Sequence, residues 1–376
     1  MKKKVCVITN PRTKAATIPM SNLIDILVVL SSYVYLITGN EGGSQLKQKP
    51  IDGFSIIYKA RRSKISRVIA YAILQTRIIL EIIKISRKID YYLFFMGEGL
   101  LFPLLACKMT GKPVVLVLAA SAAKIEMGGD RFSGFLVKME NISYGMADRI
   151  IVYSPALVKE WNLVRFQSKV RFAHEHIINM DQFKIEKPLA ARANLVSYIG
   201  RFSEEKGIER FVQAVFYVVK ERSDLSFMAG GTGPLKDKIE QYLAENKLTG
   251  LVMLPGWISH DNLADYLNDT KLLVLPSYTE GLPNIMLEAL ACGTPVLATQ
   301  VGTVPDYIKD SETGFIMENN SPECLARNIT RALNHPDLEK IALNGRRMVE
   351  REFTFNKTVD RFEKILTELK KDHGLL

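Results

Sequence analysis

The chain has 376 residues, of which 47% are hydrophobic and 24% carry a charge. These values are typical of a globular protein, exclude a disordered or low-complexity chain, and allow two domains with separate apolar cores. Four cysteines stand at positions 6, 107, 292 and 324 without paired spacing, which argues against a disulfide framework or a zinc site and predicts a reducing compartment.

The positive charge is concentrated in the first half of the chain. Residues 1–180 carry 26 Lys+Arg and 12 Asp+Glu, a net +14, whereas residues 181–376 carry 24 and 28, a net −4. Residues 59–88 contain nine basic residues interleaved with aliphatic ones and only one acidic residue, Glu81. Two interpretations stay open: a helix resting on an anionic membrane surface, or a sheet-packing helix with a solvated basic side. No nucleic-acid motif is present, so nucleic acid is not an expected partner.

No membrane-spanning helix is expected from the apolar segments. The longest candidate, Leu23 to Ile37, contains Asp25 and two serines, and it is shorter than the roughly 20 residues that a spanning helix needs. The apolar run after the basic N-terminus is too short for a signal peptide, and it reads instead as a first strand, Val5 to Thr9.

The first half of the chain alternates predicted strands and helices. A strand at Tyr91–Phe95, an apolar helix at Leu100–Met109 and a strand at Val114–Leu118 form a βαβ unit, with Gly111 ending the helix. Another strand ends at Ser154. The pair His174-x-His176 is interpreted as structural, and residues 184–194 as a polar linker.

A second parallel α/β domain is predicted after this linker. Strands at Leu195–Gly200, Leu225–Ala229 and Val252–Leu254 alternate with helices at Ile208–Lys220 and Leu235–Asn246. The turn at residues 230–234 is glycine-rich but is not a dinucleotide fingerprint, because Lys236 stands where the third glycine would be.

The segment from Lys271 to Gly302 contains the residues most indicative of function. An apolar strand, Leu272–Leu275, precedes a helix that begins near Pro283 and ends at Gly293, and a second strand follows. A helix N-terminus at the carboxyl edge of a parallel sheet can bind a phosphate. Glu280 would lie beside that phosphate, and Glu288, among apolar neighbours, needs a hydrogen-bonding partner unless it points to water.

Two basic residues follow the first strand of the second domain at the same edge. Arg201 can grip phosphate oxygens with its planar fork, and Lys206 can add a point charge, so together they can neutralise a leaving diphosphate. The alternative is that both are ordinary surface charges.

The segment EGLPNIMLEALACGTPVLAT closely resembles the signature of the family 4 glycosyltransferases, retaining enzymes that use nucleotide sugars. Residues 90–163 and 177–183 resemble the N-terminal half of the same family. The resemblance implies an α/β protein of the GT-B fold, with two Rossmann-like domains facing each other across an interdomain cleft. It assigns residues 1–182 to an acceptor domain and 195–357 to a nucleotide-sugar donor domain. A final helix at about 358–376 is expected to pack back on the first domain.

The resemblance also assigns roles to individual residues. It implies that Glu280, Arg201 and Lys206 are catalytic, and that the donor is bound by Glu288, Gly281, Leu282, Pro283, Asn284, Ile258 and Gly231. No cofactor and no metal are expected, and the absence of an Asp-x-Asp motif argues against a metal-held diphosphate. The chain departs from the family at Asn10–Ala16, where a glycine pair is usual, and at Ala119–Ser121, where many members have a histidine.

The expected function is retaining transfer of a sugar from a nucleotide sugar to a glycan, lipid or polyisoprenoid-linked acceptor. The expected location is the cytoplasm, with a peripheral position at the inner face of the membrane if the basic helix binds lipid. Two alternatives remain: a nucleotide-sugar epimerase of the same fold, and a catalytically silent protein that keeps the donor pocket.

Overall fold

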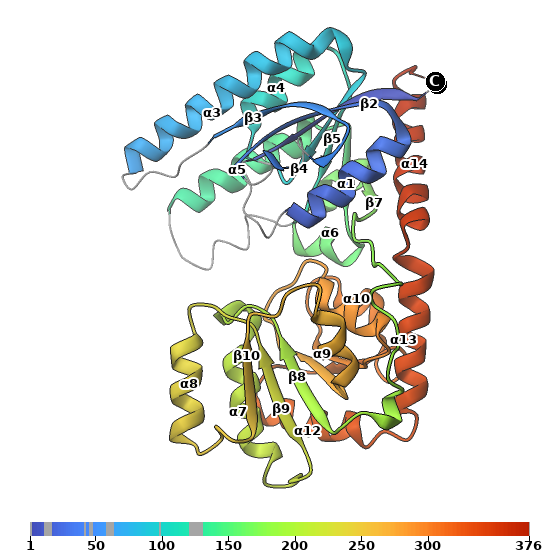
Figure 1. The fold of residues 1–376 in the computed structure, drawn as a ribbon. Helices are drawn as coiled ribbons and strands as arrows, with labels where there is room; N and C mark the ends of the chain where they lie inside the picture. The colour runs from blue at the N-terminus through green and yellow to red at the C-terminus, as the bar shows by residue number, and fades with distance from the viewer. Residues whose placement is uncertain are drawn as a thin grey trace. The chain divides into compact units, whose positions relative to one another are not determined.

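The chain folds into two compact units, each built on a sheet. The computed structural model describes residues 2–10, 17–40, 43–44, 48–57, 64–97, 99–119 and 131–375 (Figure 1). Unit 1 comprises Met1–Ile177 and Phe355–Leu376, and unit 2 comprises Ile178–Thr354. Every strand pair in both described sheets is parallel, which confirms the predicted α/β class.

The described sheet of unit 1 has seven strands in the order β3-β2-β1-β4-β5-β6-β7. Its central strands are buried on both faces, which is why they appear in the sequence as uninterrupted apolar runs. The strands are β1 (Lys3–Thr9), β2 (Ser31–Gly39), β3 (Asp52–Ile56), β4 (Tyr91–Phe95), β5 (Val114–Val117), β6 (Arg149–Val152) and β7 (Val170–Phe172).

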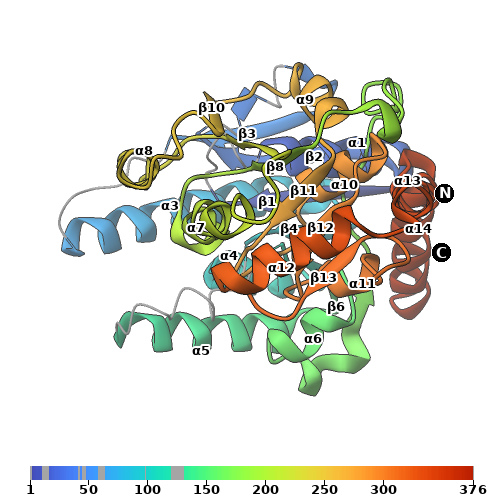
Figure 2. The same cartoon turned by 90° about the horizontal axis from the view of Figure 1, so that it is seen from below.

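Helices cover both faces of this sheet. On one face, α1 (Thr17–Leu30) and α14 (Phe355–Asp372) share an apolar core with β1, β2 and β4. On the other face, α3 (Lys64–Ile85), α4 (Leu101–Met109) and α5 (Arg131–Met146) lie side by side (Figures 1 and 2). A short helix, α6 (Ala156–Glu160), follows β6.

The structure adds detail to two segments of unit 1 considered in the sequence analysis. The apolar stretch from Leu23 to Ile37 is two elements, since α1 ends at Leu30 and β2 begins at Ser31. The final helix begins at Phe355 rather than at about residue 358. It packs in the core of unit 1 through Phe362, Ile365, Leu366 and Leu369. No helix among the described residues has both the length and the apolar character needed to cross a bilayer.

Unit 2 has a sheet in the order β10-β9-β8-β11-β12-β13. The strands are β8 (Leu195–Ile199), β9 (Ser226–Gly230), β10 (Val252–Gly256), β11 (Leu272–Leu275), β12 (Val296–Thr299) and β13 (Phe315–Met317). On one face lie α7 (Ile208–Val218) and α12 (Pro322–Leu333), and on the other α9 (Leu263–Asp269) and α10 (Asn284–Ala291) (Figure 2). Helix α13 (Leu338–Glu352) contacts α10 and also adds Leu338, Ile341 and Ala342 to the core that contains α7 and α12. Helices α8 (Lys236–Glu245) and α11 (Val304–Tyr307) complete the unit.

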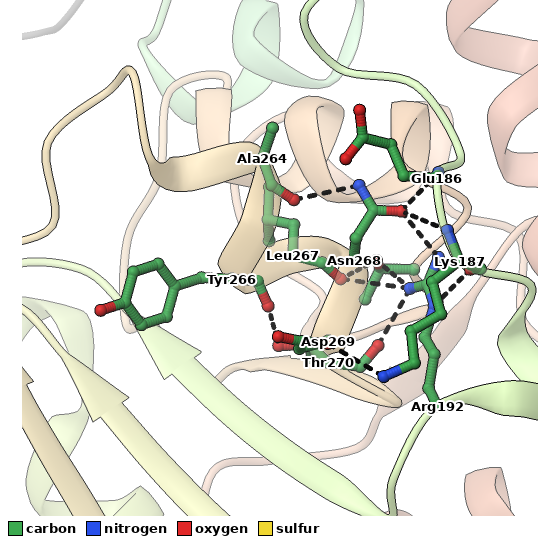
Figure 3. Close-up of polar contacts among 10 residues, drawn as sticks. Glu186, Lys187, Arg192, Ala264, Tyr266, Leu267, Asn268, Asp269 and Thr270 are labelled. Carbon is green, nitrogen blue, oxygen red and sulfur yellow. Dashed lines mark hydrogen bonds and ion pairs between the residues drawn. The ribbon is translucent and has the colours of Figure 1, made fainter.

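The predicted linker, residues 184–194, is an integral part of unit 2. The guanidinium of Arg192 is buried and donates hydrogen bonds to the backbone carbonyls of Leu267 and Thr270 where α9 ends (Figure 3). It also donates to the carbonyl of Cys292 where α10 ends. The side-chain oxygen of Asn268 accepts the backbone N–H groups of Glu186 and Lys187. The carbonyls at helix C-termini carry partial negative charge and satisfy the buried cation, so this polar segment is docked rather than free.

Candidate active site at the carboxyl edge of unit 2

The strand order of unit 2 reverses between β8 and β11, and the predicted site residues flank this point. The chain runs from β8 outward to β9 and β10, then returns to add β11 on the opposite side of β8. In open parallel sheets, ligands bind outside the carboxyl ends of the strands where such a reversal occurs. Arg201 and Lys206 follow β8, and Glu280 follows β11. The topology therefore places all three at the edge where a ligand is expected.

Lys206 and Glu280 form an ion pair across the reversal point. The Lys206 ammonium donates to both carboxylate oxygens of Glu280, at 2.8 and 2.7 Å, and the Ser277 hydroxyl donates to Oε1 at 2.7 Å. The Glu280 side chain is 8% exposed and that of Lys206 33%. Charge-assisted hydrogen bonds of this length hold a carboxylate in one orientation. The two residues that the sequence analysis assigned separately, Lys206 and Glu280, therefore form one hydrogen-bonded pair.

Arg201 stands at the end of β8 with an exposed side chain. Its backbone is held in place because the Tyr198 hydroxyl donates to the Arg201 carbonyl at 2.7 Å. The guanidinium therefore projects from a fixed backbone at the same edge, although the structure shows no direct contact with Glu280.

The loop that carries Glu280 is held by the loop after β12. Gly302 has a backbone φ of +56°, and a methyl group in place of its hydrogen would lie 1.9 Å from the Glu280 carbonyl oxygen. Next to it, Thr303 donates its hydroxyl and its N–H to the Gly281 carbonyl at 2.7 and 3.1 Å. Only glycine allows both this φ and this approach, so Gly302 fixes the backbone under Glu280.

Helix α10 directs its N-terminus toward this edge. It begins at Asn284 with Pro283 as an extended N-cap, and its first turn contains no acid. Gly293, in the left-handed conformation with φ +67°, follows its C-terminus as the sequence predicts. Gly281 and Asn284 are partly exposed, whereas the side chains of Leu282 and Pro283 are buried and can offer only backbone groups to a ligand. The N-terminus of α10 carries partial positive charge suited to a phosphate.

Glu288 has a partner that the sequence did not reveal. It is buried in α10, and its Oε1 lies 3.1 Å from Nε2 of His260. The His260 ring contacts Phe183 edge-on at 5.2 Å, and Gln182 donates to the His260 carbonyl at 2.9 Å. The hydrogen bond to Glu288 raises the pKa of His260 above its ordinary value. The apolar neighbours of Glu288 predicted that some partner must exist, but nothing in the spacing pointed to His260.

The glycine turn after β9 is explained by backbone packing. Gly231 has φ +137°, and its N–H donates to the Gly256 carbonyl at 2.7 Å. A methyl group at Gly231 would lie 1.9 Å from the Gly200 carbonyl oxygen. The side chain of Ile258 covers the adjacent Gly230. The N–H of Gly231 is therefore already used, and the donor contacts assigned to Gly231 and Ile258 stay predictions.

A second group of polar residues lies at the carboxyl edge of the sheet of unit 1. Glu175 and its two histidine neighbours, His174 and His176, are buried after β7. Tyr153, which follows β6, donates its hydroxyl to Glu175 at 2.5 Å, and Arg361 of α14 lies 2.9 Å from Nε2 of His174. Burial raises the pKa of Glu175 to about 7.

Two sequence features of the first domain lie outside the described residues. They are the loop of residues 11–16, with Arg12 and Lys14, and residues 120–130, which include Ala120 and Ser121. In the part of the chain that the structure describes, no three His, Cys, Asp or Glu side chains are grouped so that they could hold a metal ion.

The C-terminal part of the chain is similar to known sequences. Residues 179–348 match the family model described as "Glycosyl transferases group 1". An uncharacterized glycosyltransferase of Methanocaldococcus jannaschii is 30% identical over 176 residues, covering 47% of this chain and 48% of the relative. The N-acetyl-alpha-D-glucosaminyl L-malate synthase of Bacillus anthracis is 26% identical over 278 residues, covering 71% of each chain. The chain spans about half the length of the first curated relatives that it matches.

Solved structures match nearly the whole chain. HepE of Anabaena in complex with UDP has a TM-score of 0.79 at 15% identity, covering 97% of this chain and all of that one. Sucrose-phosphate synthase of Thermosynechococcus elongatus has a TM-score of 0.76 at 18% identity, covering 98% and 100%. These structures confirm the predicted fold, two parallel-sheet domains of the GT-B type.

Proposed function

We propose that this chain, which has the GT-B fold and matches the group 1 glycosyltransferase family model over residues 179–348, is a glycosyltransferase that transfers a sugar from a nucleotide-sugar donor to an acceptor hydroxyl. The observation that carries the proposal is the Lys206–Glu280 ion pair, placed beside the N-terminus of α10 where the strand order reverses. The relatives named as glycosyltransferases and the UDP bound in HepE support a nucleotide-sugar donor.

Different parts of the donor would be bound by residues of different charge at the carboxyl edge of the sheet of unit 2. The diphosphate lies at the N-terminus of α10, with its charge neutralised by Arg201 and Lys206. Glu288 accepts hydrogen bonds from the ribose hydroxyls, and Glu280 accepts them from the hydroxyls of the sugar. Because Lys206 already binds Glu280, it couples the orientation of the sugar to the position of the diphosphate.

The proposed reaction breaks the bond between the anomeric carbon and the β-phosphate oxygen and forms a bond to the acceptor oxygen. Negative charge grows on the departing diphosphate while the sugar gains oxocarbenium character. Arg201, Lys206 and the amides at the start of α10 stabilise the former, so this proposal requires no metal ion. The acceptor hydroxyl attacks from the face that the diphosphate leaves, gives its proton to the departing phosphate, and the anomeric configuration is retained.

The acceptor belongs to one of three classes in this proposal: a glycan, a lipid or a polyisoprenoid-linked sugar. Its binding is assigned to the first domain, residues 1–182, and the donor to residues 195–357. Transfer would take place in the cytoplasm, from a pool of cytoplasmic nucleotide sugars. None of the comparisons favours either the epimerase or the silent binding protein.

The function is tested in two steps. A thermal-shift screen of nucleotide sugars identifies the donor, because a ligand that binds only the folded state raises the melting temperature. Product analysis with that donor and candidate acceptors then measures turnover. The proposal expects a glycosylated acceptor and a free nucleoside diphosphate. Epimerisation of the free donor would support the epimerase instead, and binding without any turnover would support a silent protein.

A further inference from the structure

The solvent-facing side of α3 carries large apolar side chains. Leu74, Ile78 and Ile82 point into the protein and are buried, so the helix does cover the sheet. A helix in that position normally exposes polar residues on its other side. On α3, however, the exposed side carries five aliphatic residues, each 53–62% exposed: Val68, Ile69, Ile73, Leu80 and Ile83.

The neighbouring helix α4 also exposes large apolar side chains. Phe102, Leu105 and Met109 are spaced three and four residues apart, so they share one side of the helix, and they are 56%, 46% and 82% exposed. Helices α3 and α4 lie side by side on the same face of the sheet (Figure 2). Exposed apolar side chains on two helices that pack side by side indicate a binding surface. We call these eight residues and the cations described next the α3–α4 surface.

The exposed charge on this surface is positive. Arg77, Lys84, Arg87 and Lys88 are exposed along α3 and the 3-10 helix Ser86–Lys88 that continues it. The single acid in these described elements, Glu81, is buried; it accepts a hydrogen bond from Tyr35 and pairs at 3.4 Å with the ammonium of Lys84, whose side chain is still largely exposed. Apolar side chains and cations thus lie together without an exposed carboxylate among the described residues of α3 and α4.

We propose that the α3–α4 surface docks the protein on an anionic lipid bilayer. The aliphatic and aromatic side chains enter the boundary between headgroups and acyl chains, while the cations bind lipid phosphates. A second copy of this chain is a poorer occupant, because pairing the same surface would set its cations against one another. The two interpretations of the basic helix are therefore compatible: α3 packs on the sheet with one side and offers lipid the other. The inference does not depend on the proposed transfer reaction.

Vesicle co-sedimentation of the full chain tests this inference directly, without any nucleotide. The vesicles contain phosphatidylcholine alone, or phosphatidylcholine and phosphatidylglycerol in a two-to-one ratio. We expect the protein to sediment with the mixed vesicles, to stay in solution with the neutral ones, and to bind less at higher salt. Failure to bind the mixed vesicles overturns the inference.

Three variants locate the contact. The charge variant Arg77→Gln/Lys84→Gln/Lys88→Gln and the apolar variant Ile69→Ser/Ile73→Ser/Leu80→Ser are each expected to weaken binding to the mixed vesicles at least tenfold. The matched control removes three exposed lysines of unit 2, Lys236→Gln/Lys247→Gln/Lys340→Gln, and is expected to bind like the wild type. All three should retain the wild-type circular dichroism spectrum.

The outcomes distinguish docking on lipid from self-association and from nonspecific attraction by net charge, and they separate lipid binding from donor binding. Equal loss in the control would mean that net charge alone drives binding, which overturns a defined surface. Self-association of the wild type that the apolar variant abolishes, without vesicle binding, would identify a second copy as the occupant. The melting-temperature rise caused by a nucleotide sugar should be the same in all three variants, so a failure of donor binding is detected separately.

Discussion

Both sheets place a glutamate at their carboxyl edge, but the two residues have opposite surroundings. Glu280 of unit 2 is bound by an ammonium and a hydroxyl and has some contact with solvent. Glu175 of unit 1 is fully buried and accepts a hydrogen bond from the Tyr153 hydroxyl, while its Oε2 has no partner among the described residues. Burial without a cation raises the pKa of Glu175 to about 7.

The contrast shows that a position at the carboxyl edge does not by itself make a carboxylate functional. An acid that must accept hydrogen bonds from a sugar has to be held in place and reachable, and two hydrogen bonds from the Lys206 ammonium hold the Glu280 carboxylate, which keeps some contact with solvent. Glu175 has the opposite environment, which favours the protonated form and a structural role. The predictions below test this difference.

The largest effect is expected from removing the negative charge of Glu280. Glu280→Gln keeps the side-chain shape but loses the ion pair and weakens contacts to the sugar, so kcat should fall by about 10²–10³-fold. Affinity for the nucleoside diphosphate should change little, because Glu280 is assigned to the sugar. Glu204→Gln, at an exposed position in the loop after β8, is the matched control and should keep wild-type turnover. Wild-type kcat in Glu280→Gln would refute the assignment.

The next effect concerns the backbone beneath Glu280. Gly302→Ala combines a left-handed φ with a clash against the Glu280 carbonyl and should lower the free energy of unfolding by about 3–5 kcal/mol. Gly256→Ala is the matched control, since Gly256 has φ +74° but no atom within 4 Å of the added methyl group. Gly256→Ala should lower the free energy of unfolding by about 1–2 kcal/mol. Urea denaturation measures both, and equal losses would show that the Glu280 loop moves aside.

A smaller effect is expected from the proton on Glu175. Between 4.5, the ordinary pKa of a glutamate, and the folded-state pKa of about 7, the folded state holds a proton that the unfolded state has lost. Stability therefore falls as pH rises through this window, by about 2–3 kcal/mol between pH 5 and pH 8. Glu175→Gln should remove this contribution. Urea denaturation measures the free energy of unfolding of the variant and of the wild type at pH 5 and at pH 8. If the difference between the two proteins is the same at both pH values, the prediction is contradicted.

The smallest effect concerns His260. Its pKa is raised by Glu288, so the ion pair between them is present below that raised pKa and is lost as pH rises through it. A positive charge beside the ribose-binding carboxylate favours the anionic nucleotide, so nucleoside diphosphate affinity should fall a few-fold from pH 6 to pH 8. In His260→Asn, the affinity for the same nucleoside diphosphate should depend less on pH. The ligand's own titration affects the variant and the wild type equally, so it does not contribute to the difference. Identical pH profiles by calorimetry would exclude this role.

Local sequence signals predicted the elements of the site well. Strand β11 matches the predicted Leu272–Leu275, because an apolar run ended by Pro276 can be read without knowing the rest of the fold. Gly293 ends α10 as expected for the same reason. The boundary between α1 and β2 was not predicted, because apolar residues stand on both sides of the serines at 31 and 32 and neither glycine nor proline marks the end of the helix.

The contacts between distant residues could not be predicted in the same way. Lys206 and Glu280 were each assigned to the edge, but their direct pairing spans 74 positions and depends on the strand order. The pairing of His260 with Glu288 spans 28 positions and depends on how α10 packs. Arg192 was assigned to a polar linker, because nothing in the local sequence shows that the ends of two helices supply its carbonyl partners.

The central claim is that a nucleoside diphosphate lies at the carboxyl edge of unit 2, between Arg201 and Lys206 and the start of α10. The most direct test is calorimetric titration of uridine, guanosine and adenosine diphosphates into the wild type, Arg201→Met and Lys206→Met. The account predicts that at least one of them binds the wild type and that each substitution weakens its binding at least tenfold while the fold is kept. Absence of binding by all three, or binding that neither substitution changes, would contradict it.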